Sequence, residues 1–346
     1  MRAPVGLRLD YLSPAEYQSA SWSDVLGVAT FSGPPAPAPA NGGEIPVAEV
    51  NMPLLLGTAS ICEVWRSGEP AESGSRNRVR FRRSENLLFG CIALAESQIA
   101  GAPGGPPALH VATVEAYRDI CGTLDALGYP HLLRVWNYLP DINRDLDGTE
   151  RYRLFNRARQ DALSGCGRAV SGSVPAASAL GAASGSPLVV YFLAGRSAPT
   201  FIENPRQTSA YRYPRQYGSH RPLFSRATLL RQAGSLTLFI SGTASIVGHR
   251  SIHLGDTAAQ TRETLTNIGA LVEEANRADP GARFSLSDLA LKVYVRRPAD
   301  LPVIRGQLAA LLEPTSRVIY LHADICRQDL LVEIEATGSC ALKADG

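Results

Sequence analysis

One order of elements occurs in both halves of this chain, and it constrains the fold more than any other feature of the sequence. In the first half, an apolar strand, a stretch with helical spacing and a second strand occupy residues 87–95, 109–127 and 132–138. In the second half, the same order is found at residues 236–241, 257–278 and 289–296. Residue identity between the halves is slight, but the shared order and spacing predict two related α+β units.

The segment between these halves is predicted to be a connection. Residues 164–186 are rich in Gly, Ala and Ser. The N-terminal unit would then span residues 1–163, including a variable N-terminal segment whose Pro/Ala-rich stretch Pro34–Gly43 is expected to be a loop or a stiff tether. The C-terminal unit would span residues 187–346, and we expect it to carry most of the active site.

The C-terminal stretch Tyr320–Ala336 is predicted to form a strand, a sharp loop and a second strand. Successive side chains of a strand point to opposite faces, so Glu333 and Glu335 share one face while Val332 and Ile334 point to the other. Two carboxylates on a mainly apolar strand are unfavourable unless they are exposed, paired or protonated. The sequence leaves two interpretations open: a solvated outer face, or a carboxyl group tuned for acid–base chemistry.

Charge and composition argue against several classes of protein. The 346 residues carry a formal charge of only +2, so no global basic field points to nucleic acid. A hydrophobic content of 45% is enough for a substantial core, yet no apolar run is long enough to span a bilayer. The six Cys lie far apart without a C-x-x-C motif, and no signal peptide opens the chain. We expect a cytoplasmic protein with no nucleic-acid or membrane partner.

Motifs that hold common cofactors and metals are not found in the sequence. There is no Walker loop, no G-x-G-x-x-G fingerprint and no G-x-S-x-G nucleophile elbow. His249 and His253 are four residues apart, as zinc ligands on a helix can be, but no H-E-x-x-H arrangement accompanies them. We therefore predict neither a cofactor nor a metal site.

Several Arg and Tyr residues occupy positions that suggest a binding pocket. Tyr152 and Arg159 are seven residues apart on one predicted helix, and hence on one face. Tyr213 and Arg226 belong to an aromatic loop punctuated by Pro, and loops on a rigid scaffold often carry binding sites. Arg296 ends a predicted strand. Each residue alone is more simply explained as an exposed polar side chain, but together they predict a pocket for a small polyanion.

Long stretches of the chain resemble those of one enzyme family, the chorismatases. The resemblance spans most of the chain from about Val64 onward and does not include the first forty residues. The stretches that carry it are LGYPHLLRVWNYLPDIN (Leu127–Asn143), ERYRLFNRAR (Glu150–Arg159), FIENPRQTSAYRYPRQYG (Phe201–Gly218), FSRAT (Phe224–Thr228), LFISGTASIVGHRSIHLGD (Leu238–Asp256), LKVYVRRPADL (Leu291–Leu301) and HADICRQDLLVEIEA (His322–Ala336).

The resemblance implies an α+β fold with two YjgF/chorismate-mutase-like units in one chain, in which mixed sheets are packed with helices on one face. It also implies chorismate as the small-molecule substrate and loss of the enolpyruvyl group as pyruvate. By this similarity Tyr152, Arg159, Tyr213 and Arg226 would contact the substrate, and Glu333 would be the catalytic acid.

Two further positions indicate a branch of the family. The branch that hydrolyses chorismate to a dihydroxycyclohexadiene carboxylic acid is similar but has Ala where this chain has Gly242 and Cys326. The branch that forms 3-hydroxybenzoate has Gly and Cys there, so the resemblance implies 3-hydroxybenzoate as product, through an arene oxide, with some 4-hydroxybenzoate in certain relatives. We expect Gly242 to leave room at the substrate ring. We expect Cys326 to assist arene-oxide opening, with Arg327 as a possible source of a lowered thiol pKa.

Two other functions stay open at this level. The first is hydrolysis of chorismate, which differs only in the fate of the ring. The second is an imine deaminase or a metabolite-binding protein of the YjgF type, because one fold can host several functions. The length of the chain, its double unit and the Tyr/Arg set argue against this second alternative. A monomer is expected, with a weak oligomer as the alternative.

Overall fold

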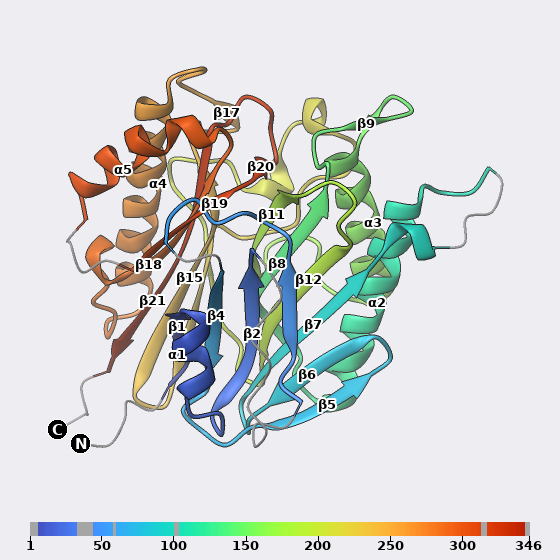
Figure 1. Cartoon of the computed structure of the whole chain (residues 1–346), viewed down its shortest axis with the longest axis vertical. Coiled ribbons are helices and arrows are strands. Elements are labelled where there is room, and N and C mark those ends of the chain that lie inside the picture. Colours follow the sequence, from blue (N-terminus) through green and yellow to red (C-terminus); the bar gives the residue numbers. More distant parts are fainter. Residues whose placement is uncertain (1–5, 33–43, 58–59, 100–103, 313–316, 343–346) are drawn as a thin grey trace.

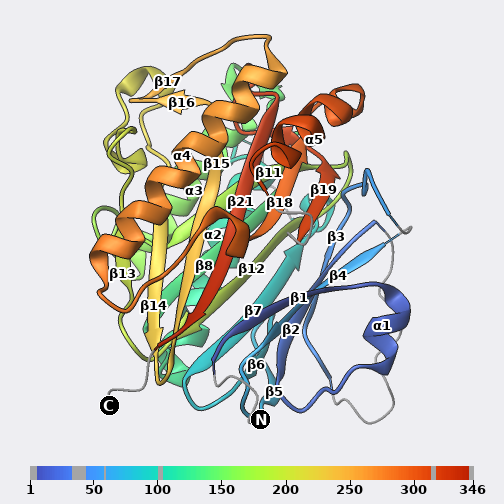
Figure 2. The ribbon, with the colours of Figure 1, turned by 90° about the vertical axis from the view of Figure 1, so that its left-hand side faces the viewer.

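The computed structural model describes residues 6–32, 44–57, 60–99, 104–312 and 317–342. The predicted loop Pro34–Gly43 lies outside these residues. The described chain forms three large sheets and two small two-stranded ones, with two pairs of helices on the outside (Figures 1 and 2).

The first unit is built on a mixed seven-stranded sheet. Helices α2 (Ala108–Leu127) and α3 (Arg151–Gly165) pack against one face of it. In order across the sheet, its strands are β20 (Asp324–Ile325), β11 (Ala176–Ala182), β8 (His131–Pro140), β12 (Leu188–Gly195), β7 (Leu87–Leu94), β6 (Val79–Arg83) and β5 (Glu72–Arg76). The outermost strand β20 comes from the C-terminal half of the chain and pairs with β11, so it joins the two units directly.

The second unit has a six-stranded sheet, again with two helices on one face. Helices α4 (Thr257–Ala278) and α5 (Leu301–Ala309) cover it, and Figure 2 shows α4 lying along its strands. The strands in order are β13 (Thr200–Ile202), β14 (Ala227–Gln232), β15 (Ser235–Ala244), β21 (Val332–Ala341), β18 (Ala290–Val295) and β19 (Val318–His322).

The two sheets have the same topology. The order β11-β8-β12-β7-β6 in the first corresponds to β19-β18-β21-β15-β14 in the second, with α2 and α4 in equivalent connections. The predicted α+β fold with a repeated unit is confirmed. Helix α4 begins and ends where the sequence predicts. Asp256 fixes its start, because its side chain accepts a hydrogen bond from the backbone of Ala259 in the first turn.

The boundary between the units differs from the prediction. The segment 164–186, expected to be only a connection, contains β11, and β12 belongs to the first sheet rather than to the C-terminal unit. The sequence of β11, AASALGA, has few bulky side chains and therefore lacks the usual signal of a strand. Its small residues let the second unit approach closely: Ala176 and Ala177 donate backbone hydrogen bonds to the hydroxyls of Thr228 and Ser241.

A third sheet, formed by the N-terminal segment, was not predicted as a separate layer. Its strands in order are β1 (Arg8–Leu12), β4 (Ile61–Arg66), β2 (Val25–Phe31) and β3 (Val47–Val50), with the short helix α1 (Pro14–Ser19) beside them. It packs against the helix-free faces of the other two sheets (Figure 1). Trp65 from this sheet contacts Trp136 of the first unit and Phe239 of the second, so the aromatic core joins all three layers.

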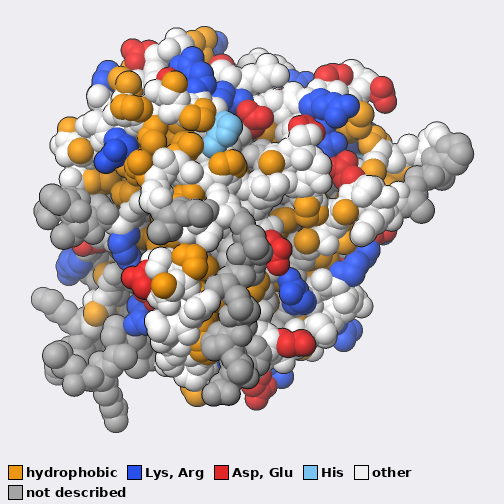
Figure 3. All heavy atoms as spheres, viewed as in Figure 1, with side chains coloured by type: hydrophobic (Ala, Val, Ile, Leu, Met, Phe, Trp, Pro, Cys, Tyr) orange, Lys and Arg blue, Asp and Glu red, His pale blue; other side chains and the backbone are white. Residues whose placement is uncertain are grey.

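The surface offers no broad region of one charge on the face shown in Figure 3, where basic and acidic side chains are interspersed. Among the described residues, none of the helices is both long and apolar enough to cross a membrane.

Candidate active site

Strand β21 positions both candidate carboxyl groups. Val332 and Ile334 pack into the core beneath α4 and α5, while Glu333 and Glu335 point to the other face, toward the first unit. The predicted alternation is confirmed, and the alternative of a solvated outer face is wrong, because the two Glu residues are only 4% and 5% exposed. The register with β15 shifts between Ile240 and Thr243, which places a bulge beside Glu333. Bulges of this kind often accompany active sites.

A cavity of about 870 Å³ lies between the two units. It is large enough for a small aromatic or cyclic metabolite. Seven of the eight predicted site residues line it: Tyr152, Arg159, Tyr213, Arg226, Gly242, Cys326 and Glu333. Helix α3 supplies the first two, the loop before β14 the next two, and the strands β15 and β21 with the loop between β20 and β21 the rest. Both units of one chain therefore build the site.

Arg296, predicted to bind substrate, does not line the cavity. Its guanidinium donates to Asp324 Oδ1 (2.7 Å) and to the backbone oxygens of Leu330 (2.7 Å), Ile325 (2.9 Å) and Arg327 (2.9 Å). Arg296 therefore fixes the loop between β20 and β21, and a substrate could use it only by breaking these bonds. The sequence placed Arg296 correctly at a strand end, but the carbonyl groups that surround it could not be foreseen.

Glu333 lies in an environment that favours its protonated form. Burial raises the pKa of its carboxyl group to about 8, and the negative charge of Glu335 acts in the same direction. The thiol of Cys326 lies beside it, with Sγ 3.8 Å from Glu333 Oε2. A carboxylic acid that keeps its proton near neutral pH can act as a general acid.

Glu335 has the opposite environment. Burial alone would raise its pKa, but Lys292 and Arg134 outweigh this effect and lower the pKa of Glu335 to about 2. Its oxygens lie within hydrogen-bond distance of Lys292 Nζ (2.8 Å), Arg134 Nη2 (2.9 Å), Trp136 Nε1 (2.7 Å), Ser178 Oγ (2.7 Å) and Tyr294 OH (3.1 Å). Such a carboxylate is fixed in its ionised form.

Gly242 lets the carboxyl group of Glu333 take its present position. A Cβ at this residue would lie 2.0 Å from Glu333 Oε1 and 3.2 Å from Ser178 Oγ. Real Cβ atoms do not approach other atoms this closely, so any side chain at 242 must displace the Glu333 carboxyl group. Gly242 also lines the cavity, so the expectation that it leaves room at the substrate ring stays a prediction beside this second role.

The thiol of Cys326 is held neutral. Burial and the nearby Glu333 raise its pKa, and Arg327 offsets only part of this rise. Arg327 does act to lower the thiol pKa, as the sequence suggested, but burial and Glu333 raise it more. Gly242 and Cys326, the two positions that indicate the branch, both border the carboxyl group of Glu333.

Two Arg residues that line the cavity have buried donors without a partner. Arg159 is 3% exposed, and its Nε and Nη2 have no partner. These two nitrogens form one edge of the guanidinium, which is the edge that binds a carboxylate through two parallel hydrogen bonds. Arg226 is 2% exposed, donates through Nη2 to Thr208 O and Tyr213 OH (both 2.7 Å), and has an unpartnered Nε.

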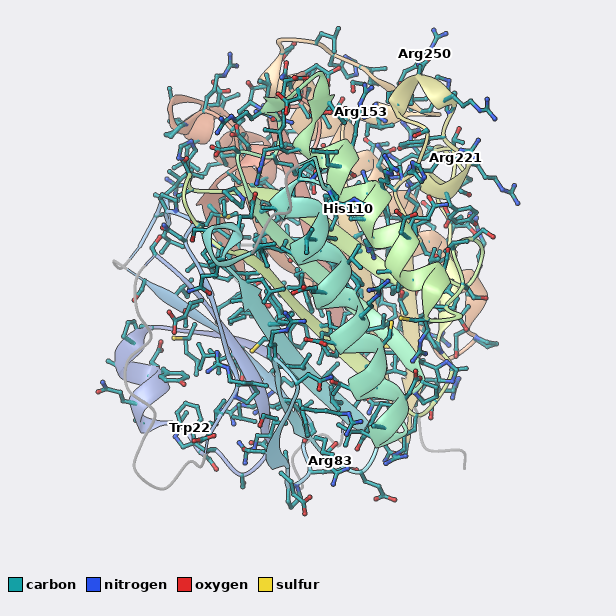
Figure 4. The ribbon with its side chains drawn as sticks, turned by 90° about the vertical axis from the view of Figure 1, so that its right-hand side faces the viewer. Trp22, Arg83, His110, Arg153, Arg221 and Arg250 are labelled. Atoms are coloured by element: carbon teal, nitrogen blue, oxygen red, sulfur yellow. The ribbon has the colours of Figure 1, made fainter. Side chains whose placement is uncertain are left out.

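Other lining residues were missed by the sequence analysis. Ser178 lies on β11, in the segment read as a connection, so no signal could have found it. Asn156 lies four residues after Tyr152 on α3, where helical spacing would have included it, whereas Arg153 directly follows Tyr152 and the spacing gives no sign of it. Arg153 and Arg250 also line the cavity, and Figure 4 shows both at the same end of the molecule as Arg221.

The two spaced histidines do not form a metal site. His249 Nδ1 lies 3.2 Å from Tyr217 OH, whereas His253 Nε2 lies 3.9 Å from Glu263 Oε2. Within the part of the chain that the structure describes, no group of three or more His, Cys, Asp or Glu side chains could hold a metal ion.

Comparisons with known proteins agree on one family. A family model described as "Chorismatase FkbO/Hyg5-like, N-terminal" matches residues 63–194. A protein of Streptomyces rapamycinicus named chorismatase is 41% identical over 80% of this chain and 81% of its own length. A protein of Streptomyces hygroscopicus named 3-hydroxybenzoate synthase is 38% identical over 84% of both chains. A crystal structure of a chorismatase covers 96% of this chain and 98% of its own, with a TM-score of 0.83 and 34% identity.

Proposed function

Since this chain belongs to the chorismatase family, we propose that it converts chorismate to 3-hydroxybenzoate and pyruvate. One observation carries the proposal: a buried carboxyl group with a pKa of about 8 borders a cavity that is also lined by two Arg residues with buried, unpartnered donors. The name of the Streptomyces hygroscopicus relative supports the choice of product.

Chorismate is a dianion, with one carboxylate on the ring and one on the enolpyruvyl group. We propose that the free edge of Arg159 binds one carboxylate through two hydrogen bonds, and that Arg226 contributes its unused Nε to the other. Burial raises the pKa of Tyr152 well above its ordinary value, so its hydroxyl stays a hydrogen-bond donor to substrate oxygens. Because the donors are fixed before the substrate arrives, they orient it without further reorganisation.

The first chemical step is proton transfer from the Glu333 carboxyl group to the methylene carbon of the enolpyruvyl group. This leaves an oxocarbenium centre that is conjugated with the ether oxygen, so the bond between ring C3 and that oxygen can break and release pyruvate. The C4 hydroxyl then attacks C3, and its proton passes to the Glu333 carboxylate, which restores the acid. The product of this step is a 3,4-arene oxide, and no water enters.

Aromatisation completes the reaction. Cleavage of the C4–O bond and loss of the hydrogen at C3 give 3-hydroxybenzoate, whereas cleavage at C3 would give 4-hydroxybenzoate. We propose that Cys326 assists this opening. Because its thiol is neutral and Glu333 has just regained its proton, attack by sulfur at C4 requires that Glu333 gives its proton to the epoxide oxygen as the C4–O bond breaks and takes the thiol proton, across the 3.8 Å contact, in the same step. Loss of the C3 hydrogen as a proton, with departure of the sulfur from C4, then restores the thiol and completes the aromatic ring.

The site is bordered by both units of the same chain, so we propose that a monomer is sufficient for activity. The test of the function is the reaction of the purified protein with chorismate in ¹⁸O-labelled water. We expect equal amounts of pyruvate and hydroxybenzoate, with no label in the ring product. A labelled dihydroxycyclohexadiene carboxylic acid would indicate the hydrolytic branch, and chorismate binding without pyruvate release would indicate a binding protein.

A further inference from the structure

Three separate segments line the cavity, and together they are called its roof. The first is the loop 204–226, which contains the short 3₁₀ helices η2 (Ala210–Arg212) and η3 (Arg215–Tyr217). The second is the hairpin of β16 (Ile246–Val247) and β17 (Arg250–Ser251), and the third is the loop between β20 and β21. All three contribute residues to the cavity lining.

Arg327 is the residue at which these three segments meet. It belongs to the third segment and donates through Nη1 to His249 O (2.9 Å) and Ser251 Oγ (3.2 Å) of the hairpin. Its guanidinium carbon also lies 4.2 Å from the ring centre of Tyr217 and 5.2 Å from that of Tyr213, both in the first segment. A guanidinium stacked on aromatic rings in this way is attracted to their π faces.

One part of this guanidinium is not used by the roof. Arg327 Nη2 is buried and has no hydrogen-bond partner, although the residue borders the cavity. A buried donor of a charged group without a partner is unfavourable. Such a donor beside a cavity that already holds two other Arg side chains fits an anionic ligand that completes its hydrogen bonds.

The number of free donors points to the ligand group. Arg159 can hold one carboxylate alone, because both nitrogens of one edge are free. Arg226 Nε and Arg327 Nη2 are buried without a partner, and both residues adjoin Tyr213, Arg226 at its hydroxyl and Arg327 near its ring. A second carboxylate that accepts one hydrogen bond from each would satisfy both.

We propose that Arg327 is a further substrate-binding residue, which shares the second carboxylate of chorismate with Arg226. Because Arg327 also holds the roof segments together, substrate binding would make the roof more rigid. This inference rests on the proposed function. A bound carboxylate would fix the guanidinium from below, while His249, Ser251 and Tyr217 hold it from above.

The test uses the Glu333→Gln protein, in which chorismate binding can be titrated without turnover. Adding Arg327→Met is expected to raise the dissociation constant of chorismate at least ~10-fold, the factor for a lost hydrogen bond to a charged group. Arg327→Lys is expected to lose part of that affinity, because it keeps the charge but not the planar donor. An unchanged dissociation constant in Arg327→Met would overturn the proposal.

Arg196 provides a matched control. It too stacks on a tyrosine ring, 4.3 Å from the centre of Tyr129, and donates to backbone oxygens, but it does not line the cavity. Arg196→Met should leave chorismate binding unchanged. If Glu333→Gln does not bind chorismate and the wild type releases no pyruvate, the proposed function fails. If Glu333→Gln binds chorismate and the Arg327 variants bind it as tightly as the Arg196→Met control does, only this inference fails.

Sharing of one carboxylate is tested by double-mutant cycles in the same background. The losses of affinity in Arg226→Met and Arg327→Met should not multiply, whereas those of Arg159→Met and Arg327→Met should. Multiplicative losses in both pairs would contradict sharing.

Hydrogen exchange measures the rigidity of the roof and does not require the Arg327→Met variant to fold. Chorismate should slow exchange of residues 209–222 in Glu333→Gln but much less in Glu333→Gln with Arg327→Lys, and equal slowing in both would contradict tightening through Arg327.

Discussion

Glu333 and Glu335 lie two residues apart on the same face of β21, yet the protein gives them opposite protonation states. Glu333 meets a cavity, a thiol and no positively charged partner within hydrogen-bond distance among the described residues, so its pKa rises to about 8. Glu335 meets two cations and three neutral donors, so its pKa falls to about 2. Strand geometry determines only that the two side chains share a face; their chemistry depends on what the neighbouring sheets bring to that face.

The ionised residue also supports the protonated one. The negative charge of Glu335 is the second cause of the raised pKa of Glu333, after burial. Glu335 can remain ionised because Lys292, which also lies 2.5 Å from Glu63 Oε2 of the N-terminal sheet, is buried beside it. All three sheets thus contribute to the proton affinity of the acid, which gives the unpredicted N-terminal layer a functional role.

The largest expected effect is on activity when Glu333 is replaced. Glu333→Gln removes the only proton that the proposed first step uses, so pyruvate release should fall by at least ~10²–10⁴-fold, the contribution of positioned acid catalysis. The fold should be retained, because Gln is isosteric with the neutral acid. A coupled pyruvate assay with a circular dichroism spectrum measures both quantities, and a largely active variant would refute the assignment.

The corresponding change at Glu335 should act mainly on stability. Glu335→Gln leaves Lys292 and Arg134 with one fewer negative partner in the core, and breaking a buried ion pair on one side typically lowers stability by ~3–5 kcal/mol. Loss of the negative charge should also lower the pKa of Glu333 and move the upper limit of activity to lower pH. Denaturant unfolding and a pH–rate profile check this. If Glu335→Gln lost pyruvate release as severely as Glu333→Gln at every pH while staying equally stable, the division of roles would be wrong.

An intermediate effect is expected at the glycine beside the acid. Gly242→Ala should lower pyruvate release by ~10–100-fold, because the new methyl group displaces the Glu333 carboxyl and misplaced catalytic groups are costly. Cys326→Ala added to it should recover part of this loss, since it opens space on the other side of the same carboxyl, and should shift product toward the dihydrodiol. Gly122→Ala, where a Cβ meets no atom within 4 Å, is the matched control. A double variant no faster than Gly242→Ala, with an unchanged product, would argue against this coupling.

The smallest effects are expected at Arg159 and Arg226, the two Arg residues proposed to bind the carboxylates of chorismate, and the effects should differ between the two. Arg159→Ala should lower kcat/KM by a factor that corresponds to at least ~1.5 kcal/mol of lost transition-state stabilisation, because two unpartnered donors are removed. Arg226→Ala should have a similar or smaller effect, because it removes the unpartnered Nε. Steady-state kinetics at fixed ionic strength measure both. Wild-type kinetics in either variant would show that this residue does not bind the substrate.

Local patterns predicted the elements, and the resemblance predicted much of the site. Periodicity located α2, α4 and the paired strands, and the alternation in β21 placed Glu333 and Glu335 together. The partners of Glu335 could not be predicted, because Trp136 and Arg134 are 199 and 201 residues away in the sequence. Strand β11 was missed because its small side chains give no strand signal, and Arg296 was misassigned because the carbonyl groups that bind it come from a loop without a recognisable pattern.

The central claim is that Glu333 holds a proton that Glu335 does not, and infrared difference spectroscopy can test it directly. Spectra of the wild type minus Glu333→Gln, recorded from pH 5 to pH 10, would isolate the carboxyl band of Glu333. We predict the band of a protonated carboxylic acid at pH 6, which is lost with a midpoint near pH 8 as activity is lost. A carboxylate band already present at pH 6, or a midpoint near the ordinary value of about 4.3 for Glu, would contradict the claim.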